Sequence, residues 1–228
     1  MTTRIRNAYH ARMATIITVA GLKGGIGKSV TALHLAAYLE REVGEGSTLL
    51  VDGDPNGTIL DWGSGGGLPM PVVSEMQAMR RAQEYEYAVL DTKARPEPGY
   101  LEELADGSDF MVLPTEPSLA CLRVLMQTVE TLSEHGRTDD LRALLTIVPP
   151  WPNRDGERAR RTLEKAGVPI FSKEIKRRQV LNKAIEDGVP VYNVKERTAA
   201  KAWEEYAEVG EEMAKLVGAN EAAKVSDG

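Results

Sequence analysis

Short apolar runs alternate along the chain with segments in which apolar residues recur every three or four positions. The short runs are rich in β-branched residues and have the length of buried strands, whereas the second spacing is that of amphipathic helices. Strands that alternate with helices predict an α/β fold with a mostly parallel sheet flanked by helices. The predicted strands are 15–20, 47–51, 87–91, 110–115, 144–148 and a short one at 168–171.

Helical spacing also indicates which side chains cover the sheet. We expect Met76, Met79 and Ala82 in the core, and a closing helix near the C-terminus that docks on the core through one apolar face. A basic helix is predicted at 155–167 and a glycine-rich loop at 63–71. The positions that define the helical faces are 30–39, Met76, Met79 and Ala82, Leu122, Leu125, Val129 and Leu132, and Trp203, Tyr206, Met213 and Leu216.

Length and composition favour a single domain. With 228 residues, 42% of them hydrophobic, the chain can bury one core. We expect a domain at 14–217, a polar, disordered extension at 1–13 and a flexible tail at 218–228. The single cysteine, Cys121, excludes an internal disulfide or a cysteine-ligated cluster and is expected to be a small core residue. No apolar run approaches the roughly 18 residues of a membrane span and no signal-peptide core is present, so we predict a cytoplasmic protein with no membrane partner.

Positive charge is concentrated in one part of an acidic chain. The net formal charge is −6, which by itself does not predict nucleic-acid binding. Residues 158–201, however, hold 12 Lys and Arg against 5 Asp and Glu. Such a segment suits either a surface that faces a polyanion or a solvated helix face, and both interpretations stay open here. The candidate DNA-binding residues are Lys173, Lys176, Arg177, Arg178 and Lys183.

The first predicted strand leads into the segment 21–29, which reads G-L-K-G-G-I-G-K-S, and a predicted helix follows. A glycine-rich turn into a helix N-terminus binds anions, because its backbone N–H groups can approach a phosphate closely. Lys28 is placed to reach the β- and γ-phosphates of a nucleotide, and the Ser29 hydroxyl to hold Mg²⁺. The strict P-loop pattern is not met, since Leu22 stands at its first glycine and Lys23 adds a second lysine. We predict a nucleotide site.

The segment K-G-G-I-G-K-S resembles the deviant Walker A motif of the ParA/MinD ATPases, in which the early lysine is the signature residue. The resemblance implies ATP and Mg²⁺ as cofactors and an ATP-bound homodimer in which Lys23 reaches the partner's nucleotide and acts with Lys28 in catalysis. It also implies that the segment 114–119 lies at the dimer face. The implied ATP-binding residues of the loop are Lys23, Gly24, Gly25, Ile26, Gly27, Lys28, Ser29 and Val30.

Acidic residues follow two predicted strands. Asp52 and Asp54 end the second strand in D-G-D-P-N-G, where carboxylates suit phosphate-bound Mg²⁺ and an attacking water. This segment resembles the family's D-x-D-P-Q motif, with Asn56 in place of Gln. The resemblance implies that Asp52 binds Mg²⁺ through water, that Asp54 orients the nucleophilic water, and that Asp91, at the Walker B position, is an outer-sphere Mg²⁺ ligand. Pro149 and Pro150 are implied to line the adenine.

The resemblance also carries a function. It implies that the ATP dimer binds double-stranded DNA of the nucleoid without sequence preference, which favours the DNA interpretation of the basic segment. A ParB-like or McdB-like adaptor would stimulate ATP hydrolysis and release the dimer, and the cycle would position a cargo. Plasmid or chromosome DNA is the favoured cargo, and carboxysomes or another protein organelle are the alternative. A metabolic ATP-dependent transferase of the same fold is the alternative from another class.

Overall fold

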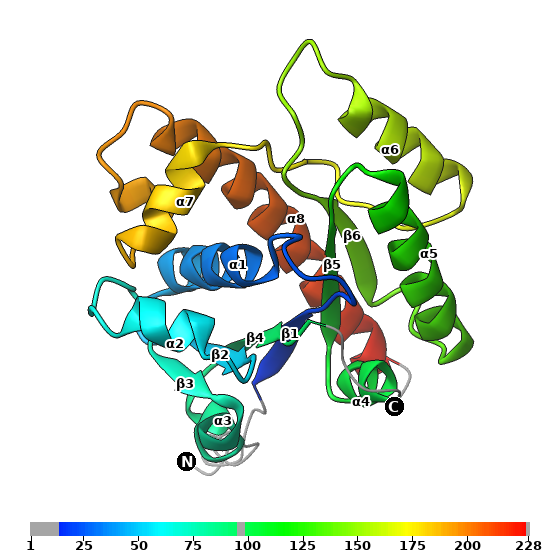
Figure 1. The fold of residues 1–228 in the computed structure, drawn as a ribbon. Coiled ribbons are helices and arrows are strands. Elements are labelled where there is room, and N and C mark those ends of the chain that lie inside the picture. Colours follow the sequence, from blue (N-terminus) through cyan, green and yellow to red (C-terminus); the bar gives the residue numbers. More distant parts are fainter. Residues whose placement is uncertain (1–13, 95–98, 227–228) are drawn as a thin grey trace.

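A six-stranded, all-parallel sheet forms the centre of the protein (Figure 1). The computed structural model describes residues 14–94 and 99–226. The strand order is β3-β2-β4-β1-β5-β6, so the chain runs from β1 out to the edge strand β3, returns with β4 beside β1, and then continues to the other edge through β5 and β6. The strands are β1 Thr15–Val19, β2 Thr48–Gly53, β3 Val72–Ser74, β4 Tyr87–Thr92, β5 Phe110–Thr115 and β6 Leu141–Leu145.

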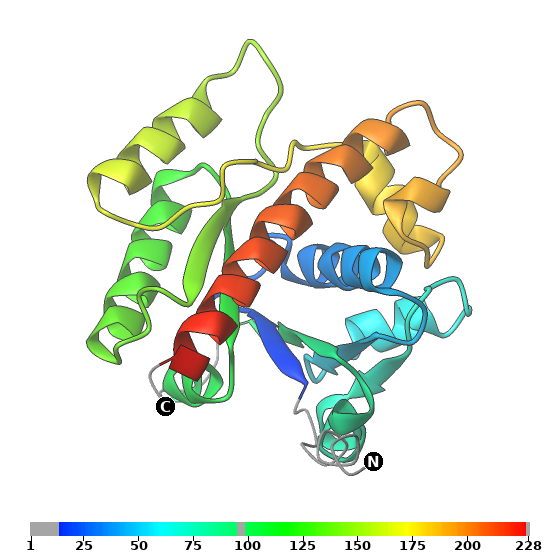
Figure 2. The same cartoon turned by 180° about the vertical axis from the view of Figure 1, so that it is seen from behind.

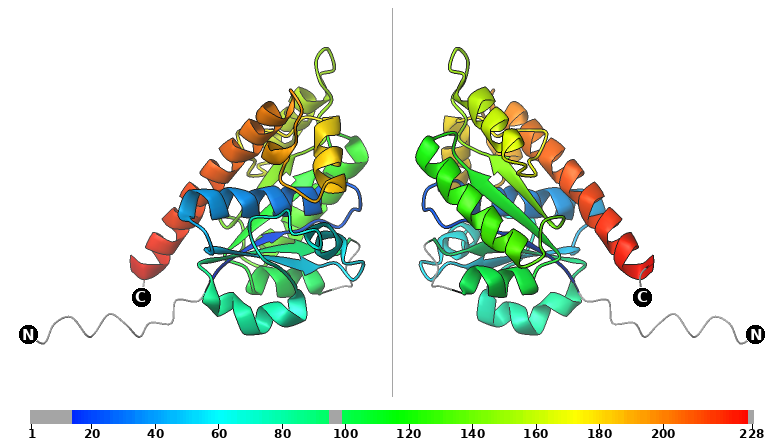
Figure 3. Two further views of the ribbon diagram at one scale, coloured as in Figure 1. Left: turned by 90° about the vertical axis from the view of Figure 1, so that its left-hand side faces the viewer. Right: turned by 90° about the vertical axis from the view of Figure 1, so that its right-hand side faces the viewer.

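Helices cover both faces of the sheet (Figure 3). One face packs on α1, α2, α7 and α8, and the other on α3, α4, α5 and α6. Both faces of the strands are therefore buried, as parallel sheets require, and their sequences are apolar almost throughout. The helices are α1 Lys28–Val43, α2 Thr58–Gly63, α3 Glu75–Arg81, α4 Tyr100–Asp106, α5 Leu119–Glu134, α6 Asp155–Lys165, α7 Gln179–Glu186 and α8 Ala199–Ser226, with 3₁₀ turns at Ala82–Glu84 and Val191–Asn193.

The α/β prediction is confirmed, with local differences in the strands. β6 begins at Leu141, three residues earlier than predicted, because pairing with β5 aligns Met111 with Leu141. The short strand β3 was not predicted; its three residues pair with β2. The segment 168–171 is not a strand, since it makes only an isolated bridge between Ile170 and Ala143.

The prediction that Met76 and Met79 lie in the core is wrong. These side chains are 74% and 81% exposed. Ala82, which was also expected in the core, does pack there: it lies in the 3₁₀ turn after α3 and covers β2 and β3 together with Ala78 of α3 and Tyr85. Helical spacing located the helix but did not identify its buried face.

The closing helix α8 docks as predicted and extends further. Tyr206 and Met213 are buried in the core, and α8 runs obliquely across α1 (Figure 2). Gly210 permits this crossing, because a Cβ there would lie 2.4 Å from Cγ of Tyr38. The helix continues to Ser226, into the segment 218–228 that was expected to be a flexible tail, and the predicted extension at 1–13 lies outside the described residues. Within residues 14–94 and 99–226, no helix combines the length and the apolar character needed to cross a membrane.

Candidate functional site

The carboxyl ends of β1, β2 and β4 bring the sequence motifs together. In the sheet, Val19 of β1 and Asp52 of β2 both align with Asp91 of β4. The glycine-rich loop leaves β1 at this edge, and the loop that carries Asp54 leaves β2 beside it. Three segments that are distant in sequence therefore form one site, at the edge where parallel α/β sheets bind ligands.

The glycine-rich loop turns directly into α1. Gly25 and Gly27 have φ values of 75° and 85°, in the left-handed region that glycine enters without strain. Gly27 is the N-cap of α1 and has no side chain to satisfy the helix's first N–H groups. These N–H groups can bind an anion, and the positive end of the α1 dipole favours negative charge there.

Thr146 holds the loop against the end of β6. Its hydroxyl donates to the carbonyl oxygen of Ile26 at 2.7 Å and lies 3.2 Å from that of Thr115. The Ile26 side chain is buried and packs on Gly21. A Cβ at Gly21 would lie 2.8 Å from Cδ1 of Ile26. The loop is therefore preorganised by packing as well as by its own turn.

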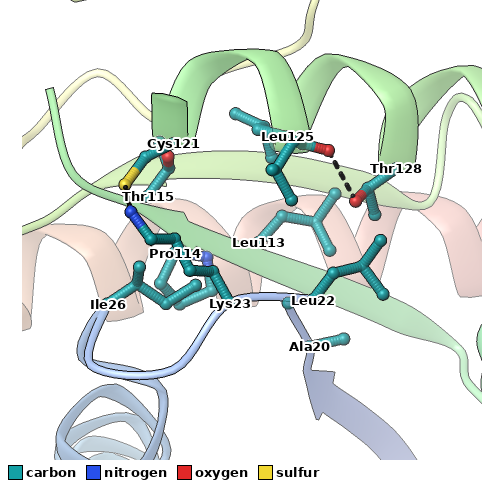
Figure 4. A pocket seen from close by; sticks show the side chains of 12 residues that line it. Ala20, Leu22, Lys23, Ile26, Leu113, Pro114, Thr115, Cys121, Leu125 and Thr128 are labelled. Carbon is teal, nitrogen blue, oxygen red and sulfur yellow. Dashed lines mark hydrogen bonds between the residues drawn. The ribbon is translucent and has the colours of Figure 1, made fainter. Parts of the chain in front are cut away.

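The two lysines of the loop point to different places. Lys28 is 7% exposed and lines the large cavity beside α1. Burial lowers the pKa of Lys28, and the charges of Asp91 and Asp54 partly offset this. Lys23 reaches away from that cavity, and its Nζ donates to Sγ of Cys121 at 3.0 Å (Figure 4). Lys28 Nζ in turn donates to the backbone oxygen of Lys23 at 3.3 Å.

The large cavity has a volume of about 590 Å³, enough for a nucleotide-sized ligand. One wall consists of motif residues from the sequence prediction: Gly24, Gly25, Gly27, Lys28, Ser29, Val30 and Asp54. The opposite wall was not predicted, and it comes mainly from Ile175 to Asn182 together with Ile147 and Tyr206. Pro149 and Pro150, the expected adenine contacts, are not among the lining residues, and the loop beyond them leads to Trp151, whose side chain is 86% exposed.

A strained turn brings the second wall to the site. Ile147 is the one non-glycine residue of the described chain with a positive φ, 53°, a conformation that is unfavourable for a β-branched side chain. Directly after it, the backbone N–H of Val148 donates to the oxygen of Ile175 at 3.0 Å, and Ile175 N–H donates to Leu145 oxygen at 2.8 Å. These bonds fix the segment that follows Ile175 against the cavity.

Asp52 organises the loop after β2, a role that the sequence did not reveal. Its Oδ2 accepts from the N–H groups of Ile59 and Leu60 in the first turn of α2, at 2.9 and 3.0 Å. Its Oδ1 accepts from Asp54 N–H at 3.0 Å. The buried carboxylate therefore ties the Asp54 loop to α2, and its remaining lone pairs can still bind a Mg²⁺-bound water.

Asp91 fits the magnesium role expected of it. Its side chain is fully buried at the end of β4, and among the described residues neither oxygen has a hydrogen-bond partner of ordinary geometry. Burial raises the pKa of Asp91 to about 7, and the Ser29 hydroxyl and the Lys28 charge act in the opposite direction. A buried carboxylate whose hydrogen-bonding capacity is largely unused suits a cation. The described residues contain no cluster of three His, Cys, Asp or Glu side chains that could hold a metal ion by themselves.

Acidic residues pair with most of the predicted DNA-binding patch. Lys173 contacts Glu208 at 2.6 Å, and Lys183 contacts Glu196 at 3.0 Å. Lys176 pairs with Glu174, and Arg178 with the buried Glu205 of α8. Within the part of the chain that the structure describes, Arg177 alone of the five has no ion pair, and it lines the cavity. The charge available to a polyanion is therefore smaller than the sequence suggested.

Comparisons with known proteins agree with this geometry. The chain matches the family model for the CobQ/CobB/MinD/ParA nucleotide binding domain over residues 17–191. Two relatives are named maintenance of carboxysome distribution protein A. The relative from Gloeobacter kilaueensis is 31% identical over 205 residues, covering 87% of this chain and 93% of its own; that from Halothiobacillus neapolitanus is 30% identical over 201 residues, covering 83% and 92%. The solved structure of a Cyanothece McdA variant in complex with ATP shares the fold, with a TM-score of 0.65 at 13% identity over 90% of this chain and 97% of that one.

Proposed function

Because this chain belongs to the CobQ/CobB/MinD/ParA nucleotide-binding family, we propose that it hydrolyses ATP with Mg²⁺, dimerises when ATP is bound, and uses this cycle to position a cargo. One observation carries the proposal. Lys28, Ser29 and Asp54 line one cavity beside the free N-terminus of α1, and the buried Asp91 at the end of β4 interacts with Lys28 and Ser29 from beneath. A positively polarised cradle next to carboxylates is the arrangement that phosphoryl transfer needs.

Each residue has a distinct part in this proposal. The N–H groups of the loop and Lys28 bind the triphosphate. Ser29 and Asp91, with Asp52 through water, are the residues that would hold Mg²⁺, which when bound neutralises charge on the phosphates. Asp54, fixed by Asn56, orients the water for in-line attack on the γ-phosphate. Lys23 would serve the partner's nucleotide in the dimer.

The names of the two relatives favour a protein organelle as the cargo. Both are named for the distribution of carboxysomes, and this chain covers more than nine-tenths of each. We therefore propose an organelle-positioning role, reached through an McdB-like adaptor, ahead of the plasmid or chromosome cargo that the sequence favoured. The family model also includes CobQ and CobB, so a metabolic transferase is the outcome to exclude.

The test is an assay of ATP hydrolysis and of assembly state. Purified protein should release phosphate from ATP only with Mg²⁺, and should sediment as a dimer with a nonhydrolysable ATP analogue. Lys28→Ala should abolish ATP binding, because the ammonium that faces the phosphates is lost. A protein that stays monomeric with the analogue at high concentration would contradict the proposal.

Retention on a DNA column tests the proposed DNA binding, apart from ATP hydrolysis. We expect salt-sensitive retention of the ATP dimer that is lost with ADP. Arg177→Glu should weaken retention about tenfold or more, while Lys173→Glu, whose charge is already paired with Glu208, should weaken it less. Because Arg177 lines the nucleotide cavity, both variants are compared at an ATP concentration at which each is shown to be dimeric. Equal loss in both variants would show that the ion pairs do not shield the patch.

A further inference from the structure

The glycine-rich loop separates its two lysines into two sites. Lys28 lines the large cavity beside α1, whereas Lys23 lines a second, small pocket between the loop and α5. Figure 4 shows the Lys23 side chain extending from the loop to the first turn of α5. There its Nζ donates to Sγ of Cys121 at 3.0 Å. In this conformation Lys23 does not line the nucleotide cavity of its own chain.

The acceptor for Lys23 is held firmly in place. Cys121 is the third residue of α5, and its N–H donates to the Ser118 hydroxyl that caps the helix. The thiol residue is 3% exposed, while Lys23 above it is exposed to solvent. The hydrogen bond to Cys121 is the largest cause of a raised Lys23 pKa, so the contact favours the charged ammonium.

The surroundings of this contact are open to another molecule. Leu119, two residues before Cys121, is 74% exposed although it is a large apolar side chain. The turn of α5 that carries Cys121 therefore also carries an uncovered apolar side chain. A thiol is a weak hydrogen-bond acceptor, whereas a phosphate oxygen is a strong, charged one. The Cys121 contact can therefore be exchanged for a phosphate at modest cost.

We propose that Cys121 is the resting partner of Lys23 in the monomer, and that Lys23 leaves it when two copies join around ATP. Cys121 is then a positioning residue, because it acts on the nucleotide only through Lys23. The strength of its contact sets part of the equilibrium between monomer and dimer. This inference rests on the proposed function, which gives Lys23 its role in the partner's site.

Thiol labelling tests the contact without any nucleotide. Cys121 is the only cysteine in the chain, so alkylation by iodoacetamide reports one site. Lys23→Ala removes the side chain that covers the thiol, but an ammonium beside a thiol also promotes its reactive form. Rates are therefore compared at the alkaline plateau of the pH–rate profile, where we expect alkylation at least fivefold faster than in the wild-type protein. Lys93→Ala, a lysine outside this pocket, should leave the rate unchanged. Equal rates for Lys23→Ala and wild type would overturn the contact.

Measurement of the dimer Kd tests whether Lys23 must leave Cys121, and two Cys121 variants are expected to change this Kd in opposite directions. Sedimentation with ATPγS and Mg²⁺ should give Cys121→Val a dimer Kd three- to tenfold lower than wild type, because valine cannot hold Lys23. Cys121→Asp should raise the Kd by a similar factor, since a carboxylate in the first turn of α5 holds the ammonium more tightly. Thr128→Val is the matched control: it removes a hydroxyl from the same helix and pocket, where Thr128 bonds only the Val124 carbonyl of its own helix.

The outcomes distinguish a failure of the resting role of Cys121 from a failure of the proposed function. If wild-type protein dimerises and Cys121→Val has the same Kd, the resting role is wrong and the proposed function stands. A loss of dimer in both Cys121 variants would show a merely structural residue and would also overturn the inference. If wild type stays monomeric with ATPγS, dimerisation and release are both overturned, while labelling still decides whether Lys23 covers Cys121.

Discussion

The side-chain amide of Asn56 donates to Oδ1 of Asp54 at 2.8 Å, and the backbone N–H of Asn56 donates to the same oxygen at 2.9 Å. Two donors on one oxygen fix the orientation of a carboxylate that lines the nucleotide cavity. The shorter amide of Asn56, which replaces a glutamine in the family motif, is therefore long enough to hold Asp54.

This relationship predicts a loss of turnover without a loss of ATP binding. Asn56→Ala should lower kcat about tenfold, because Asp54 would then sample orientations that do not direct the water. Asp54→Ala should lower kcat by about a hundredfold or more and leave the dimer loaded with ATP. Steady-state phosphate release and ATP binding measure the two effects. Wild-type turnover in Asp54→Ala would refute its assigned role.

Glu205 should support the cavity wall that the sequence did not predict. Its buried carboxylate accepts from Lys176 N–H at 3.0 Å and pairs with Arg178. Glu205→Ala leaves Arg178 unpaired, which we expect to cost about 3 kcal/mol of stability and to weaken ATP binding about tenfold. Glu208→Ala is the control, since its pair with Lys173 is partly exposed and is worth about 1 kcal/mol or less. Chemical denaturation and ATP titration would show the contrast, and equal effects would argue against it.

The raised pKa of Asp91 predicts how stability depends on pH. The carboxyl has a pKa of about 7 in the folded protein against an ordinary value of 3.8, so between these pH values the folded state keeps a proton that the unfolded chain releases. Without ligand, stability should therefore fall as pH rises from 4 to 7, by about 2–4 kcal/mol. Asp91→Asn should lose this part of the pH dependence. Identical slopes in both proteins, measured by urea unfolding, would mean that Asp91 titrates normally.

Two glycines of α8 allow a matched test of how closely α8 packs on α1. A Cβ at Gly210 would lie 2.4 Å from the Tyr38 ring, whereas one at Gly218 meets no atom within 4 Å. Gly210→Ala should destabilise the protein by about 2 kcal/mol because α8 must move off α1. Gly218→Ala should stabilise it by up to about 1 kcal/mol through helix propensity. Thermal unfolding of both variants is the measurement, and a stable Gly210→Ala protein would mean that the crossing is loose.

The parts of the fold that were predicted correctly depend on local sequence. The strands are continuous apolar runs, and the glycine-rich loop with Lys28 and Ser29 is specified by adjacent residues. The second cavity wall was missed because Ile175 reaches the site through backbone bonds to Leu145 and Val148, about 30 residues earlier. No pattern within either segment encodes that pairing.

The ion-pair and hydrogen-bond partners of the charged side chains could not be predicted from the sequence either. The basic segment is visible in the chain, but Glu205 and Glu208, which neutralise part of it, lie on a helix about 30 residues later. Asp52 has the same appearance as Asp54 in the motif, although in the structure it caps α2. Spacing shows which charged groups exist, and only tertiary contact shows which of them are already satisfied.

Trp151 lies at the tip of the loop beyond β6, where its fluorescence can report on this end of the sheet. Its indole is 86% exposed, whereas Trp203 packs against the core and Trp62 lines the cavity. A dissolved quencher such as acrylamide would collide chiefly with Trp151. Any macromolecule that settles over this tip would shield its fluorescence, so the chain carries its own reporter of encounters at the nucleotide-binding edge.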